Sequence, residues 1–174
     1  MAILDDKVAI VTGSARGIGR ATAELLSENG AKVLINDLDG DVAEQTASEI
    51  DGETMVFAGD LTAPGVPDEL VQAVIDRWGK VDILVNNAGY TLDAPIHKMS
   101  DDWFQKMLDI HSIVPFRMCR AVAPHMREPA STTRPSARCI AAWWCWYQPG
   151  RWIAQVPRDS LSASQSCAVA STTT

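Results

Sequence analysis

The stretch Val8–Arg20 constrains the fold of this chain more than any other. It reads V-A-I-V-T-G-S-A-R-G-I-G-R, an apolar run that leads into three glycines. A helical pattern follows at once, with Ile18, Ala21, Leu25 and Leu26 on one face. The order of strand, glycine turn and helix is the context that dinucleotide binding requires. Glycines there let the backbone approach a pyrophosphate, and the helix N-terminus points its N–H groups at it.

The spacing of these glycines is T-G-x-x-x-G-x-G, from Thr12 to Gly19. This motif resembles the glycine motif of the short-chain dehydrogenase/reductase family. The resemblance implies a nicotinamide dinucleotide as cofactor. It also implies that the loop binds this cofactor through Gly13, Ser14, Arg16, Gly17, Ile18 and Gly19.

Strands and helices are expected to alternate along the next part of the chain. Apolar runs predict strands, and periodic segments between them predict helices. The expected strands are residues 7–11, 33–36, 54–58 and 81–85, and the expected helices are residues 18–28, 41–50 and 67–78. This alternation predicts an α/β fold with a doubly wound parallel sheet, the Rossmann fold, whose ligand lies at the carboxyl ends of the strands.

Asp37 ends the second expected strand, 18 residues after Gly19. An acidic residue at about 20 residues from the glycines accepts hydrogen bonds from the adenosine ribose, and its charge repels a 2′-phosphate. The alternative is a solvated loop aspartate, because Asp39 and Asp41 follow closely. Arg16 argues for NADP, since a basic residue there can reach a 2′-phosphate. We weight Asp37 more and predict NAD rather than NADP.

Two more motifs of the family follow the third and fourth expected strands. The turn at residues 59–62 contains Asp60, which the resemblance places against the adenine. Taken alone, an aspartate at this position is more often a helix-capping or turn residue. The tetrapeptide N-N-A-G follows a buried strand, and the resemblance places it beside the nicotinamide ribose; by itself, it fits an Asx-Gly turn. The cofactor-binding residues predicted from these motifs are Asp60, Leu61, Asn87, Ala88 and Gly89.

A long helical segment comes next. Ser100 is expected to cap a helix over residues 101–108, and residues 109–127 resemble the family's long fifth helix, a common dimer-forming element. That resemblance implies a homo-oligomer, a dimer or a tetramer. The family usually has an Asn where His111 stands, and that Asn holds a water of the proton relay. His111 is therefore a candidate for this catalytic role, and a helix histidine without a catalytic role is the alternative.

The composition changes near residue 130. Residues 1–129 hold 21 acidic residues and 11 Lys or Arg, whereas residues 130–174 hold one acidic residue, four Arg and four of the six Trp. The resemblance ends at about Glu128, before the family's catalytic Ser and its Tyr-x-x-x-Lys pair. Tyr147 and Arg151 do not form that pair, because the Pro-Gly between them breaks a helix. We predict an incomplete dinucleotide-binding domain over residues 1–129, truncated after about the fifth helix, and a non-homologous tail without ordered packing over residues 130–174.

A reading-frame error is our hypothesis for the origin of this tail. Residues 142–149 read A-W-W-C-W-Y-Q-P, and tryptophan has a single codon. Back-translated and read from the third base of each codon, the segment encodes Val-Val-Leu-Val followed by Ser or Pro. The family places an apolar strand that runs towards the catalytic Ser at this point. The alternative is a genuine tail peculiar to this lineage.

These features favour an NAD-dependent oxidoreductase acting on an alcohol or ketone, with little activity because the catalytic Ser, Tyr and Lys are absent. The alternative is a catalytically inactive dinucleotide-binding or partner-binding module, and a methyltransferase is a distant third. The net charge of −7 argues against nucleic-acid binding. No apolar run has membrane-spanning length, and no signal peptide is evident. The four cysteines show no C-x-x-C pairing, so we expect no metal and a cytoplasmic location.

Overall fold

The computed structural model describes residues 2–126, 143–148 and 151–155. The chain divides into two units, residues 1–142 and 143–174. The strands of the first unit are β1 (Val8–Thr12), β2 (Lys32–Asp37), β3 (Thr54–Ala58) and β4 (Ile83–Val85). Its helices are α1 (Gly17–Glu28), α2 (Gly40–Glu49), α3 (Val66–Trp78), α4 (Asp101–Leu108) and α5 (Val114–Met126), with a 3-10 turn, η1 (Ile96–Lys98), and a π turn, η2 (Asp109–Ile113).

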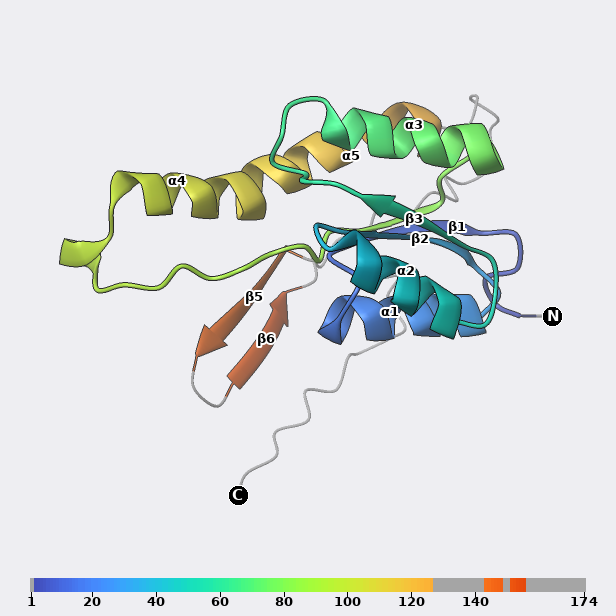
Figure 1. Ribbon diagram of the computed structural model, residues 1–174, viewed down its shortest axis with the longest axis horizontal. Helices are drawn as coiled ribbons and strands as arrows, with labels where there is room; N and C mark the ends of the chain where they lie inside the picture. Colours follow the sequence, from blue (N-terminus) through green and yellow to red (C-terminus); the bar gives the residue numbers. More distant parts are fainter. Residues whose placement is uncertain (1, 127–142, 149–150, 156–174) are drawn as a thin grey trace, which may run out of the picture. The chain divides into compact units, whose positions relative to one another are not determined.

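The four strands form one parallel sheet in the order β3-β2-β1-β4. All five residues of β1 are buried, as expected for a central strand covered on both faces. Alternate side chains enter two cores. Val8 and Ile10 pack in one core with residues of α3 and α5, while Ala9 and Val11 pack in the other with residues of α1 and α2. Figure 1 shows these helix pairs on opposite faces of the sheet, which confirms the predicted doubly wound α/β fold.

The buried face of α1 differs from the apolar face identified in the sequence. Ile18 and Leu25 are 61% and 59% exposed, while Gly19, Ala23 and Ser27 are buried. The reason is the close approach of the helix to the sheet: a Cβ at Gly19 would lie 2.2 Å from the carbonyl oxygen of Gly13. Only small residues fit along such a contact. Ile18 and Leu25 therefore lie outside the core, whereas Leu26 packs against it, so the face identified from the hydrophobic pattern is buried only in part.

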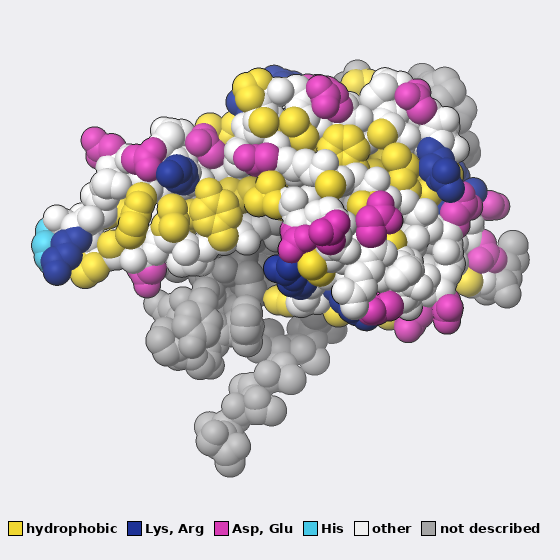
Figure 2. Space-filling view, viewed as in Figure 1, with side chains coloured by type: hydrophobic (Ala, Val, Ile, Leu, Met, Phe, Trp, Pro, Cys, Tyr) yellow, Lys and Arg dark blue, Asp and Glu magenta, His cyan; other side chains and the backbone are white. Residues whose placement is uncertain are grey.

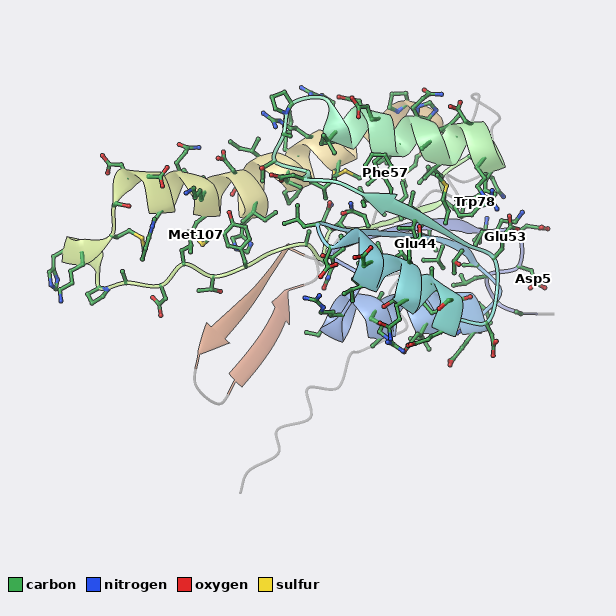
Figure 3. All side chains as sticks on the ribbon, in the orientation of Figure 1. Asp5, Glu44, Glu53, Phe57, Trp78 and Met107 are labelled. Atoms are coloured by element: carbon green, nitrogen blue, oxygen red, sulfur yellow. The ribbon has the colours of Figure 1, made fainter. Side chains whose placement is uncertain are left out.

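The predicted long helix is divided into three parts. α4 begins at Asp101, directly after its N-cap Ser100, whose hydroxyl accepts the N–H of Trp103 at 3.2 Å, so the predicted cap is confirmed. The π turn η2 then separates α4 from α5. No residue of α4 is buried. Met107, labelled in Figure 3, lies between α4 and the segment that precedes it, and its sulfur accepts the N–H of Leu92 at 3.4 Å.

The second unit contains β5 (Trp143–Gln148) and β6 (Arg151–Gln155), which pair antiparallel. Tyr147 pairs with Trp152, and Gln148 pairs with Arg151. Tyr147 and Arg151 thus belong to two strands and share no helix, as predicted from the intervening Pro-Gly. The sequence had not predicted these two strands. The serines at 160–166, judged from the sequence to be part of the tail, lie outside the described residues. No helix among the described residues has the length and apolar character to cross a membrane.

Candidate functional site

The ends of β1 and β4 are joined by one threonine and one asparagine. The Thr12 hydroxyl accepts the backbone N–H groups of Asn87 and Ala88, both at 3.0 Å. The Asn87 amide donates to the carbonyl oxygens of Thr12 and Gly13 at 3.0 and 2.9 Å. These strands flank the point where the strand order reverses, which is where open α/β sheets bind ligands. The predicted glycine loop and N-N-A-G segment are therefore brought together there.

Two glycines of the loop have backbone conformations that other residues rarely adopt. Gly13 has φ +62°, and a Cβ there would lie 2.7 Å from the Cα of Ala88. Gly17 has φ +56°, yet a Cβ there would meet nothing within 4 Å among the described residues. Packing against Ala88 explains why residue 13 has no side chain. No such contact accounts for the open space beside Gly17. That space suits a ligand that approaches the backbone closely.

The N-terminus of α1 opens beside this space. Its N-cap residue, Arg16, makes no side-chain capping bond, and the first turn of α1 has no acidic residue. The first N–H groups of a helix lack partners within the helix, and they favour an anion. Ile18 lies in the same turn with its side chain exposed. The loop therefore has the features of a phosphate-binding turn.

Two hydroxyl groups fix the loop to its neighbours. Ser14 is fully buried, and its hydroxyl donates to the carbonyl of Val11 at 2.7 Å and accepts the N–H of Asn36 at 3.1 Å. Thr46 of α2 donates to the carbonyl of Ala15 at 2.7 Å. The side chain of Ser14 is thus occupied within the protein, which leaves the loop backbone as its ligand-facing part.

Asp37 is held at the end of β2 by backbone donors. Its Oδ2 accepts the N–H of Ala15 at 3.1 Å, and its Oδ1 accepts those of Leu38 and Asp39 at 2.9 and 3.4 Å. A carboxylate offers about four acceptor sites, so these three bonds leave room for a hydroxyl donor. Next to it, the guanidinium of Arg16 forms an ion pair with Asp39.

Asp60 and Leu61 follow β3. Asp60 Oδ1 accepts both the N–H and the hydroxyl of Thr62, at 2.9 and 2.7 Å, in a turn of the Asx type. Leu61 is buried in the core that contains α3 and α5. Arg117 of α5 donates to the carbonyl of Thr62 at 3.0 Å and so ties this turn to α5.

His111 lies in the π turn and reaches the segment after β4. Its Nε2 is 2.8 Å from the carbonyl oxygen of Tyr90, so this nitrogen carries the hydrogen and donates. A Cβ at Gly89 would lie 2.8 Å from the His111 ring, so the two residues fit only because Gly89 has no side chain. π turns occur frequently at functional sites. The imidazole thus holds the backbone just after the N-N-A-G segment.

A family profile described as short chain dehydrogenase matches residues 7–134. This match covers well over half of the chain and includes every motif described above. The chain belongs to the short-chain dehydrogenase family. Membership supports a nicotinamide dinucleotide as the cofactor, in agreement with the glycine loop.

Relatives within the short-chain dehydrogenase family differ in what they act on. Sorbitol dehydrogenase from Cereibacter sphaeroides is 42% identical over 123 residues, which cover 71% of this chain and 48% of that protein. The 3-oxoacyl-acyl-carrier-protein reductase FabG from Vibrio cholerae is 37% identical over 125 residues, covering 72% of this chain and 51% of that protein. The chain thus spans about half the length of these curated relatives.

A solved structure gives the same fold. The crystal structure of a metagenomic short-chain oxidoreductase in complex with NADP matches with a TM-score of 0.68 and 33% identity. The match covers 71% of this chain and 57% of that one. That protein binds NADP, so the likeness supports a nicotinamide dinucleotide and does not favour NAD.

Several residues of this short-chain dehydrogenase site were not singled out in the sequence. Thr12 was part of the glycine motif, but its hydroxyl was not predicted to join β1 to β4. Thr46 lies in the expected helix over residues 41–50, but its bond to the loop was not predicted. Asp39 was considered only as a neighbour of Asp37. Among the described residues, no group of three or more His, Cys, Asp or Glu side chains is arranged to hold a metal ion.

Proposed function

We propose that this chain binds NAD(H) at the carboxyl end of its sheet, as the cofactor half of an oxidoreductase that acts on an alcohol or ketone. The observation that carries the proposal is the open space beside Gly17, at the uncapped N-terminus of α1. The pyrophosphate fits there, with the loop and first-turn N–H groups as donors. In this proposal the cofactor-binding residues are those predicted from the sequence, from Gly13 to Gly89.

The preference for NAD over NADP rests on Asp37. Three backbone N–H groups hold its carboxylate in place, so the charge cannot move aside to admit a 2′-phosphate. The remaining acceptor capacity suits a ribose hydroxyl. The NADP-bound structure of a relative is the counter-argument. We give Asp37 more weight, because it is a feature of this chain.

Residues of this chain position the reacting end of the cofactor. When bound, the nicotinamide supplies the hydride acceptor or donor. Asn87 and Ala88 brace the end of β4 through Thr12, and His111 holds the following carbonyl of Tyr90. His111 is accordingly a positioning residue in this proposal, and its part in a proton relay stays a hypothesis.

The 174 residues contain no lysine after Lys106, and hence no Tyr-x-x-x-Lys in residues 107–174. The family resemblance assigns proton transfer to that tyrosine. Loss of a general acid removes about 10²–10⁴-fold in rate. We therefore propose that the chain binds NAD(H) with little turnover. An inactive dinucleotide-binding module is the second candidate function, and the same absence of a Tyr-x-x-x-Lys pair favours it.

The boundary near residue 129 and the frameshift origin of residues 130–174 remain proposals. Strand β5 contains three of the four tryptophans of residues 130–174. It lies in the segment whose shifted reading frame encodes an apolar strand. Resequencing the gene decides this: a Tyr-x-x-x-Lys in the shifted frame supports the error, and the same tail in a homologue contradicts it. A cytoplasmic location is also proposed, because the cysteines lack paired spacing.

Calorimetric titration of the full chain with NADH and NADPH tests the binding proposal. We expect NADH to bind more tightly than NADPH. Stronger binding of NADPH would contradict the NAD assignment, and binding of neither would contradict the cofactor site itself. A parallel assay of NAD reduction with sorbitol separates the two candidate functions. Turnover at a rate typical of dehydrogenases would contradict the inactive module.

A further inference from the structure

We propose that Asp39 is a specificity-determining residue that weakens NADP(H) binding by pairing with Arg16. The inference rests on the proposed cofactor site and deepens it. In the proposed site Asp37 excludes a 2′-phosphate, whereas Arg16 would attract one. The contacts around Arg16 remove this conflict, because its charge is directed at a carboxylate of the protein.

The geometry places both residues at the edge of the candidate ribose site. Arg16 directly follows Ala15, whose N–H binds the Asp37 carboxylate at 3.1 Å. The guanidinium of Arg16 pairs with Asp39 Oδ2, two residues beyond Asp37. Asp39 is itself oriented, since its other oxygen, Oδ1, accepts the N–H of Val42 at the start of α2 at 3.3 Å. The carboxylate that neutralises Arg16 is therefore fixed by the helix that it caps.

Charge explains how this pair affects the two cofactors differently. A 2′-phosphate carries close to two negative charges, so it gains from a nearby guanidinium and loses from each nearby carboxylate. The hydroxyl of NAD(H) at the same place is neutral. Asp39 therefore acts twice against NADP(H): it engages the cation and adds a negative charge. Its effect on NAD(H) is small.

Exposure limits the size of the effect. The side chains of Arg16 and Asp39 are 66% and 44% exposed, and exposed ion pairs are weak and sensitive to salt. We expect Asp39→Asn to tighten NADPH binding about fivefold and to change NADH binding less than about twofold. Asparagine also caps helices well, so α2 keeps its N-terminal cap in this variant.

The control is Asp41→Asn, which makes the same change of charge two residues further on. Asp41 lies in the first turn of α2, and no ion pair joins it to Arg16 among the described residues. We expect its effect on NADPH affinity to be less than half that of Asp39→Asn. A second control is Asp39→Asn in the background of Arg16→Gln. There the gain in NADPH affinity should fall to the size seen with Asp41→Asn.

The experiment is calorimetric titration of the full chain with NADH and NADPH, at low and at physiological salt. The same titrations are made with Asp39→Asn, Asp41→Asn, Arg16→Gln and the double variant of Arg16→Gln with Asp39→Asn. A gain confined to NADPH, dependent on Arg16 and larger at low salt supports the proposal. Equal gains in NADPH affinity from Asp39→Asn and Asp41→Asn, or a gain from Asp39→Asn that is undiminished without Arg16, would overturn it while leaving NADH binding intact. Absence of binding by either nucleotide to the unmodified chain would overturn both this inference and the proposed cofactor site.

Discussion

The side chains of the glycine loop and those of helix α4 differ in how far they are engaged within the domain. Around the loop, polar groups such as those of Ser14 and Asp37 are each held by two or more hydrogen bonds within the domain. In α4, no residue is buried, and the exposed apolar side chains are Trp103, Phe104 and Leu108. Figure 2 shows hydrophobic side chains gathered along this helix. The side chains of the loop are thus engaged within the domain, whereas Trp103, Phe104 and Leu108 of α4 stay exposed among the described residues.

The largest effect is expected where the loop is most tightly packed. In Gly19→Ala, the new Cβ would lie 2.2 Å from the carbonyl oxygen of Gly13 and 2.5 Å from the Asn87 amide. Either α1 must move away from the sheet, or the hydrogen bonds by which the Asn87 amide joins β4 to β1 must break. Overpacking of this kind costs about 1–3 kcal/mol or more. We expect the free energy of unfolding, measured with urea, to fall by at least that amount, together with loss of NADH binding.

Gly17→Ala is the matched substitution in the same loop. Its Cβ would meet nothing within 4 Å, so the cost to stability is the backbone strain at φ +56°, about 1–2 kcal/mol. Binding of NADH should nevertheless be lost, because the methyl group takes the space proposed for the pyrophosphate. Retained NADH binding in Gly17→Ala would contradict the cofactor site. Equal destabilisation by both substitutions would contradict the packing difference between the two glycines.

The sequence predicted the fold of the first unit well and its contacts only in part. Strands and helices followed from apolar runs and periodicity, and Thr54–Ala58 agrees to the residue. The face of α1 was right for Leu26 and wrong for Ile18 and Leu25, because the close contact at Gly19 favours small residues over hydrophobic periodicity. The turn at η2 was missed because a π turn leaves no change in the apolar pattern. Bonds such as that of Thr46 to the loop depend on tertiary packing, which spacing along the chain does not reveal.

The exposed apolar side chains of α4 suggest an intermolecular contact. Residues 109–127 resemble a dimer-forming helix of the family and directly follow α4. We therefore propose that a second copy of the chain also covers Phe104 and Leu108, which are neighbours four residues apart on α4. Phe104→Glu with Leu108→Glu should then convert a dimer into a monomer, because charges buried in an apolar interface are costly. Sedimentation velocity at several concentrations measures this. The fold should remain, as judged by circular dichroism.

A matched control places the same two charges elsewhere on the surface. Ile3 and Leu25 are 87% and 59% exposed and lie outside α4, so Ile3→Glu with Leu25→Glu should leave the dimer intact. A wild-type chain that stays monomeric at every concentration would contradict the proposed interface. Dissociation by the control pair as well would show that added charge, and not the position on α4, is responsible.

The smallest effect on stability is expected at the amino ends of the strands, away from the glycine loop and from α4. Glu53 lies there, directly before β3. Glu53 accepts the indole N–H of Trp78 at 2.7 Å and pairs with Lys32 at 3.0 Å, and Figure 3 shows Glu53 and Trp78 together. The indole bond, followed by Lys32, lowers the pKa of the Glu53 carboxyl below its ordinary value of 4.5. A lowered pKa in the folded state means that ionised Glu53 stabilises the fold above the unfolded-state pKa. This stabilisation is lost as the pH falls through the folded-state pKa.

Replacement of Glu53 by Gln should therefore lower the free energy of unfolding by about a few tenths of a kcal/mol near neutral pH, because the carboxylate is exposed. The difference from wild type should shrink as the pH falls below about 4.5. Urea unfolding across this pH range measures it. Glu44→Gln is the control, since it makes the same change of charge at an exposed position of α2 where no ion pair or hydrogen bond joins the side chain to the described residues. A difference that grows on acidification would reverse the sign assigned to Glu53 and contradict the lowered pKa.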